Sequence, residues 1–226
     1  MAKLYQSPED YLTQQERRHT LASYIPLLGV VLMILVLLAF IARAVSSEYS
    51  ADFKIAVVLM VGLAVLILAY ILLRDYSSAQ WQAMRYAKGR SGEQRVLDAL
   101  RRLDDRYTIF YGGKISKGNI DFIVLRGGIL FNIEVKNHSG SIMFDGFEML
   151  RNGEPFPEHG LLGQVISNEK QLKFALYFLP NLNKLKIVSV LVFSNPRAFV
   201  STIGFAKGVY VTHSRLLNSF IESYCK

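Results

Sequence analysis

Two uncharged stretches constrain this chain more than any other feature. Residues 21–42 and 55–73 contain no Asp, Glu, Lys or Arg, and only 12 residues separate them. Each stretch is long enough for a helix that crosses the roughly 30 Å hydrocarbon core of a bilayer. Two such stretches so close together are uncommon as buried helices of a soluble domain. The sequence therefore predicts a transmembrane helical hairpin over residues 24–73, preceded by a tail of residues 1–23.

The basic residues beside these stretches predict how the hairpin is oriented. Lys and Arg accumulate on the cytoplasmic side of membrane spans. The connector between the two stretches holds only Lys54, with Arg43 at its start, whereas both outer flanks are richer in basic residues. We therefore expect an integral protein of the cell (inner) membrane with both termini in the cytoplasm. The alternative is a signal peptide cleaved near Ala42-Arg43-Ala44, and the second stretch would then still leave the C-terminal part in the cytoplasm. The outer basic residues are Lys3, Arg17, Arg18, Arg74, Arg85, Lys88 and Arg90.

Residues 74–88 are expected to form a polar linker and residues 89–226 one globular domain. The first 73 residues carry five basic and five acidic side chains, so the whole net charge of +8 lies beyond them. A basic domain at a membrane can bind nucleic acid or anionic lipid, or can use its charge for solubility alone. The one cysteine, Cys225, excludes an internal disulfide and a thiolate metal cluster. A homo-oligomer formed through the hairpin is also compatible with the sequence.

Charged side chains interrupt an otherwise apolar pair of predicted strands. Gly127-Gly128 separates two alternating segments, which is typical of a two-residue hairpin turn. Counting outward from that turn places Asp121 directly across from Glu134, and Lys136 joins the same face. Two acids that face each other repel, so the arrangement indicates a cation site. A structural cluster of opposite charges is the alternative.

A further acid lies on the helix predicted before these strands. Ser91 and Gln94 are spaced as in a capping box, so a helix should begin there and run to about Leu103. Glu93 shares the apolar stripe with Leu97, which points it inward. It has either a functional role or the simpler role of an acid at a helix N-terminus.

The rest of the domain alternates between strand and helix patterns. A third strand pattern follows Gly140, and a helix is expected from about Leu162 to Phe178. The β-branched run Lys186 to Ser194 is typical of a strand buried on both faces. A short strand, 208–212, and a closing helix, 214–223, complete a mixed α/β fold with a central sheet.

Four segments of the domain stand in order along the chain: Gly89-Arg-Ser-Gly-Glu93, Gly118-Asn-Ile-Asp121, Ile133-Glu-Val-Lys-Asn137 with Gly140, and Gln164. Together they resemble a known family, the nuclease-related domain called NERD, of the PD-(D/E)xK nuclease superfamily. The resemblance covers roughly Ala87 to Thr212 and implies a restriction-endonuclease-like fold with a central mixed sheet flanked by helices. Ile120 stands where the superfamily has Pro, and Glu158-His159-Gly160 replaces an Asn-Pro pair.

The resemblance implies a role for each matching residue. Asp121 and Glu134 would bind the metal, aided by the carbonyl of Val135. Lys136 would position or activate the attacking water, and Glu93 would complete or orient the metal shell. Gln164 would lie near the site. Oxygen ligands of this kind suit Mg²⁺, with Mn²⁺ as an alternative ion.

Three functions follow for testing. The first is a membrane-anchored, metal-dependent nuclease that hydrolyses phosphodiester bonds of DNA or RNA. The second is a non-catalytic module of the same fold that binds nucleic acid or protein at the membrane. The third is a scaffold assembled by the hairpin. A scaffold needs none of Glu93, Asp121, Glu134 and Lys136, so their presence favours the nuclease.

Overall fold

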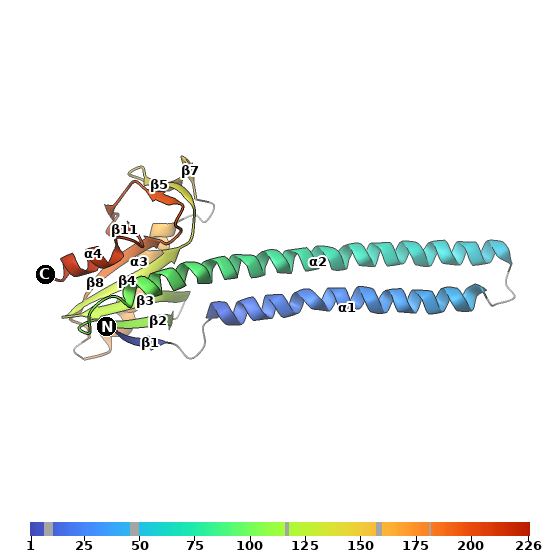
Figure 1. Cartoon of the computed structure of the whole chain (residues 1–226), viewed down its shortest axis with the longest axis horizontal. Coiled ribbons are helices and arrows are strands. Elements are labelled where there is room, and N and C mark those ends of the chain that lie inside the picture. Colours follow the sequence, from blue (N-terminus) through green and yellow to red (C-terminus); the bar gives the residue numbers. More distant parts are fainter. Residues whose placement is uncertain (7–10, 46–49, 116–117, 157–159, 181) are drawn as a thin grey trace. The chain divides into compact units, whose positions relative to one another are not determined.

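The computed structural model describes residues 1–6, 11–45, 50–115, 118–156, 160–180 and 182–226 (Figure 1). These residues fall into two compact units. The sheet unit consists of Met1–Tyr11 and Lys88–Lys226, and the helical unit of Leu12–Ala87. Each unit is described by itself.

The helical unit contains α1 (Tyr11–Val45) from Leu12 onward and the first part of α2 (Ala51–Leu100). Among the described residues, α2 is the one helix long and apolar enough to cross a membrane, and its apolar segment is not buried by protein. The apolar part of α1 that is described, Leu28–Ala39, is shorter. The predicted pair of spans in residues 24–73 is therefore not supported, and one candidate span remains.

The predicted linker, 74–88, and the predicted helix start at Ser91 both lie inside α2. The prediction of a helix start at Ser91 is wrong, because the helix is already formed there. No proline occurs in this segment, and most of its residues are compatible with a helix. The Ser91 hydroxyl donates a hydrogen bond to the Lys88 carbonyl, 2.9 Å away, one turn earlier in the same helix. Its side chain thus contacts the helix that is already formed instead of capping a new one. The helix ends at Leu100 rather than near Leu103.

The sheet unit is built on a seven-stranded mixed sheet with the order β1-β2-β3-β4-β8-β11-β10. The neighbours β4 and β8 are parallel, as are β8 and β11, whereas β2, β3 and β4 are antiparallel. The strands are β1 (Lys3–Gln6), β2 (Thr108–Ile115), β3 (Gly118–Arg126), β4 (Ile129–Lys136), β8 (Lys186–Phe193), β10 (Gly204–Ala206) and β11 (Val209–His213). A second sheet has the order β7-β6-β5-β9, with β5 (Gly140–Phe144), β6 (Met149–Arg151), β7 (Glu154–Pro155) and β9 (Ala198–Val200).

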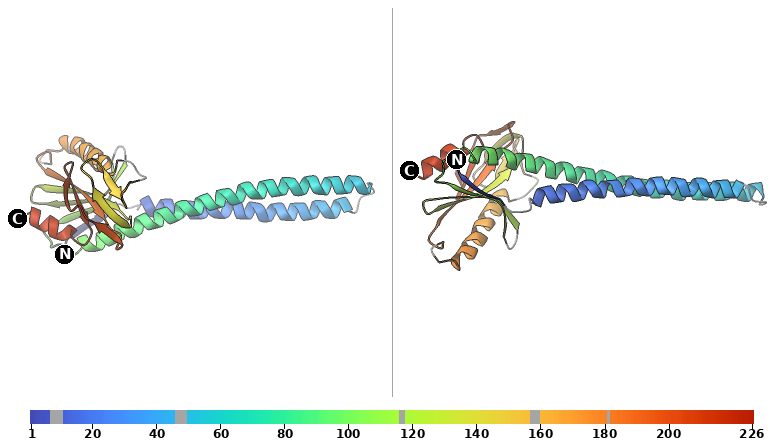
Figure 2. Two further views of the ribbon diagram at one scale, coloured as in Figure 1. Left: turned by 90° about the horizontal axis from the view of Figure 1, so that it is seen from above. Right: turned by 60° about the horizontal axis from the view of Figure 1, so that its bottom comes forward.

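Helices cover both faces of the seven-stranded sheet (Figures 1 and 2). The end of α2 and α4 (Leu217–Tyr224) pack on one face, where Val190 of β8 joins their core. On the other face, α3 (Leu161–Tyr177) packs with the second sheet around the next residue of β8, Leu191. The predicted mixed α/β fold, with a central sheet flanked by helices, is confirmed. The strand predicted to be buried on both faces is β8.

The hairpin turn predicted at Gly127-Gly128 is present. Both glycines have positive φ, at 54° and 86°, which a two-residue turn requires. Arg126 pairs with Ile129, as counted from the sequence. The register of β3 against β4 therefore follows from the two glycines.

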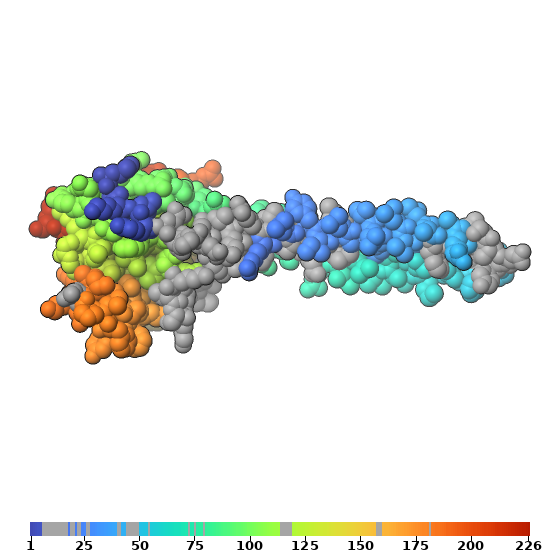
Figure 3. Space-filling view, turned by 90° about the horizontal axis from the view of Figure 1, so that it is seen from below, coloured from blue at the N-terminus to red at the C-terminus, as the bar shows by residue number. Residues whose placement is uncertain are grey.

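The first residues of the chain form a strand that the sequence did not predict. Strand β1 runs parallel to β2, with Lys3 beside Thr108 and Tyr5 beside Phe110. The rings of Tyr5 and Phe110 stack with centroids 5.3 Å apart, and Leu4 packs against the core beneath α2. Figure 3 shows these residues in dark blue on the surface of the sheet unit. The tail predicted for residues 1–23 is therefore divided: its start belongs to the sheet, α1 begins at Tyr11, and residues 7–10 lie outside the described residues.

Candidate functional site

Glu134 is a buried acid held by side chains from two elements. It lies near the end of β4, and its side chain is about 5% exposed. Its Oε1 accepts hydrogen bonds from Lys136 Nζ at 2.8 Å and from Gln164 Nε2 at 2.7 Å. Its Oε2 accepts one from Asn168 Nδ2 at 3.3 Å. Three donors thus stabilise the ionised carboxylate in a place where burial disfavours charge.

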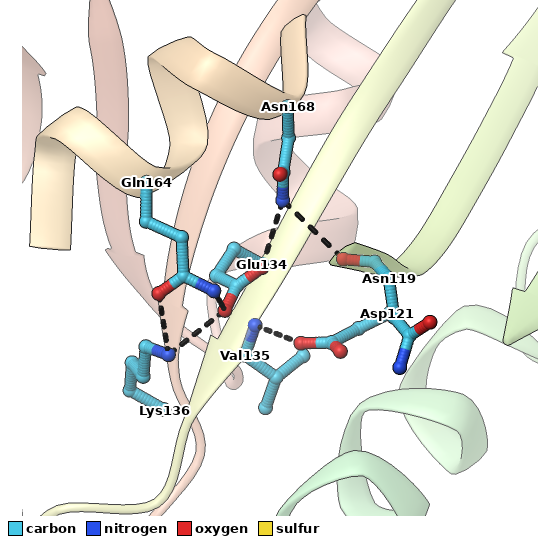
Figure 4. A network of polar contacts seen from close by, with 7 residues as sticks. All are labelled: Asn119, Asp121, Glu134, Val135, Lys136, Gln164 and Asn168. Carbon is cyan, nitrogen blue, oxygen red and sulfur yellow. Dashed lines mark hydrogen bonds and ion pairs between the residues drawn. The ribbon is translucent and has the colours of Figure 1, made fainter. Parts of the chain in front are cut away.

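Lys136 and Gln164 complete a closed set of contacts with this acid (Figure 4). Because strand side chains alternate, Lys136 lies on the same face of β4 as Glu134, toward α3. Its Nζ also donates to Gln164 Oε1 at 3.0 Å. Gln164 therefore donates to the acid with one end of its amide and accepts from the ammonium with the other. This fixes the Lys136 ammonium beside Glu134.

Asp121 lies just beyond the last paired residues of β3 and β4. The ladder ends at Phe122 opposite Ile133, so the predicted direct pairing of Asp121 with Glu134 is not part of it. Asp121 Oδ2 instead accepts a hydrogen bond from the backbone N–H of Val135, at 2.7 Å. Val135 was expected to contribute its carbonyl to a metal, and the structure assigns a role to its N–H.

The charge on Asp121 is strongly disfavoured. Its pKa is raised well above the usual range, first because the carboxyl is removed from water, and then because the charges of Glu134 and Glu93 repel it. The Val135 N–H and the Lys136 ammonium act to lower the pKa of Asp121. The two acids that raise this pKa come from β4 and α2.

Glu93 reaches the site from α2, where it accepts a hydrogen bond from the Tyr111 hydroxyl at 3.2 Å. The neighbouring residue, Gly92, marks a close approach of α2 to the residues that follow β4 and β8. A Cβ on Gly92 would lie 2.7 Å from both Asn137 Cβ and Ser194 Oγ, so a larger residue would not fit without a shift. Asn137 is held against the same helix by bonds from its Nδ2 to the Lys88 carbonyl and to Ser91 Oγ.

The donors at this site fit a hard divalent cation. A cation near Asp121 would attract its charged form and so lower the raised pKa. Among the described residues, no three His, Cys, Asp or Glu side chains lie close enough to hold a metal by themselves. The remaining pattern is one or two carboxylates with water completing the shell, as is typical of Mg²⁺.

The sequence reasoning missed Asn168, which bonds to Glu134 and also donates to the Asn119 carbonyl at 3.4 Å. Its signal was available, because Asn168 follows Gln164 by four residues and therefore lies on the same helix face. It also missed Tyr111, whose strand, β2, was not predicted.

Comparison with known proteins gives a match to one family model over part of the chain. The family model described as NERD, Nuclease-related domain, matches residues 88–194. The matched segment contains Glu93, Asp121, Glu134, Lys136 and Gln164. The same comparisons gave no matching curated protein and no matching solved structure.

Proposed function

We propose that this protein is a membrane-anchored, metal-dependent nuclease that hydrolyses phosphodiester bonds of DNA or RNA. The contact set of Glu134, Lys136 and Gln164, with Asp121 held beside it, carries the proposal. The match to a nuclease-related domain supports the same chemistry. The proposal places the domain in the PD-(D/E)xK superfamily, with Mg²⁺ or Mn²⁺ bound by Asp121 and Glu134.

The residues of this chain would divide the work as follows. Asp121 and Glu134 would hold the cation, and Glu93 would orient the shell around it. When bound, the cation would lower the pKa of a coordinated water and screen the charge of the phosphate. Lys136 would hold the attacking water and stabilise the charge that builds on the phosphate oxygens. Gln164 would keep the Lys136 ammonium in place through the bond of 3.0 Å.

Membrane anchorage rests on α2 and on the pairing of β1. Strand β1 pairs with β2, so in a membrane protein the N-terminus and residues 88–226 would lie on the same side of the membrane. One crossing between them would separate β1 from its sheet, so an even number of crossings would be needed. This supports α1 as the partner span of α2 in the proposal. The Lys and Arg distribution favours the cytoplasm for both ends.

One observation favours the second candidate, a non-catalytic module that binds nucleic acid at the membrane. Both oxygens of Glu134 already have partners within the protein. An internally satisfied acid of this kind can serve the fold alone. The two functions differ in whether cleavage accompanies binding.

The test uses the purified full chain in detergent with labelled DNA and RNA, in Mg²⁺, in Mn²⁺ and in chelator. Glu134→Gln and Asp121→Asn should abolish cleavage, and Lys136→Ala should slow it by about 10²–10⁴-fold. Glu154→Gln, which changes an exposed acid on β7, is the matched control and should cleave like the wild type. Binding without cleavage in every divalent ion would refute the nuclease and establish the module.

A further inference from the structure

A cavity lined by basic side chains, the arginine pocket, lies outside the acid site. It has a volume of about 350 Å³ and lies between the last turns of α2 and the segment that leads into α4. Three arginines line it: Arg95, Arg102 and Arg215. Asp98 is the one acid in its lining, and Asn218 forms part of the α4 wall.

The shape of the pocket is fixed by contacts between its walls. Arg95 lies on α2, and Arg102 lies in the turn that follows the end of α2 at Leu100. Asn218 Nδ2 donates to the Ala99 carbonyl at 2.7 Å, which ties α4 to the end of α2. The Arg95 guanidinium donates to Asn137 Oδ1 at 3.1 Å and to the Ser194 carbonyl at 3.3 Å. The pocket is thus formed by the fold itself.

The pocket is electropositive. Asp98 is already engaged by Gln94, at 2.9 Å, and by Arg101, at 3.6 Å, neither of which lines the pocket. Within the described part of the chain, none of the three lining arginines has a carboxylate within 4 Å. Guanidinium groups in such a position bind phosphate through paired hydrogen bonds.

The pocket adjoins the acid site. Asn137, which Arg95 contacts, directly follows Lys136, and α2 carries Glu93 two residues before Arg95.

We propose that the arginine pocket binds backbone phosphates of the nucleic-acid strand on one side of the bond that is cut. This rests on the proposed function and identifies the surface that holds its substrate. Such contacts fix the position of the strand and carry no sequence information. The pocket therefore supplies affinity that does not depend on base sequence.

The test compares the double variant Arg102→Ala/Arg215→Ala with the control Lys170→Ala/Lys184→Ala in the full chain. Both remove two exposed positive charges, the control from surfaces outside the pocket. Affinity for labelled DNA and RNA oligonucleotides is measured in chelator at several salt concentrations. The pocket variant should bind about tenfold or more weakly, and its salt dependence should fall by up to about two units of slope, while the control changes less.

Three outcomes would overturn this proposal. Equal affinity and slope in the two double variants, with wild-type cleavage retained, would refute the pocket and leave the nuclease intact. A loss confined to binding of anionic lipid vesicles would assign the pocket to the membrane instead. A wild-type chain that neither binds nor cleaves any nucleic acid would overturn the proposed function, and the pocket with it.

Discussion

The close approach of α2 to the ends of β4 and β8 predicts an unusual response to Gly92→Ala. In a helix, alanine is more favourable than glycine by about 1 kcal/mol. At Gly92, however, the added Cβ would lie 2.7 Å from Asn137 Cβ and from Ser194 Oγ, against an ordinary contact of 3.4–4 Å. The Ser194 hydroxyl has no hydrogen-bond partner and can rotate away. Asn137 Cβ cannot move without disturbing the bonds of its amide.

The magnitude follows from that overlap. A shift of about 0.7 Å is needed, and overpacking of this kind costs roughly 1–3 kcal/mol. After the gain in helix propensity is subtracted, Gly92→Ala should lower the free energy of unfolding by up to about 2 kcal/mol. The matched control is Gly163→Ala in α3, where an added Cβ meets nothing within 4 Å. Gly163→Ala gains helix propensity without any overlap, so its free energy of unfolding should rise by up to about 1 kcal/mol.

The assay is thermal unfolding of the full chain. Hydrogen exchange in β4 and β8 monitors the unfolding of the sheet unit. The free-energy difference between the two variants isolates the overlap, because both share the propensity gain. Each kcal/mol corresponds to about 2–4 °C in Tm for a domain of this size. Equal shifts of the same sign would refute the reasoning, since α2 would then not approach β4 and β8 so closely.

Three further predictions concern the site and the edge of the sheet. Because the pKa of Asp121 is raised in the fold, its contribution to stability is present below its unfolded pKa of about 3.9 and is lost as the pH rises through the raised value. Asp121→Asn should therefore unfold at a higher temperature than the wild type at neutral pH in chelator, and calorimetry should find that the advantage disappears near pH 4. Asn168→Leu should cost about 1–3 kcal/mol in thermal unfolding, because Glu134 Oε2 loses its donor in a buried place, and an unchanged Tm would contradict that bond. Tyr5→Ala should cost about 0.5–1.5 kcal/mol through loss of the stack on Phe110, whereas no change would mean that β1 does not stabilise the sheet.

The sequence predicted those parts of the fold whose signals are local. The two glycines of the β3–β4 turn set a register that the alternation of apolar residues confirms. The β-branched run of β8 and the apolar stripe of α3 also appear close to where they were expected. In each case, neighbouring residues determine both the element and the face that it buries.

Contacts between distant segments could not be predicted in this way. Strand β1 pairs with residues more than 100 positions later, and its four residues carry no strong pattern of their own. The continuity of α2 was missed because a polar composition was interpreted as a linker, although no residue there stops a helix. Asp121 was expected on the ladder, but the strands stop pairing one residue earlier, and its carboxylate turns to the Val135 N–H.

The central claim is that Asp121 and Glu134 together hold one divalent cation beside Lys136. The most direct test is titration of the full chain with Mn²⁺, in which the electron paramagnetic resonance signal reports the concentration of the free ion. The wild type and the Glu154→Gln control should each bind a single Mn²⁺ per chain that Mg²⁺ displaces, and Asp121→Asn/Glu134→Gln should lose that site. Identical Mn²⁺ binding by the wild type and this double variant would contradict the claim.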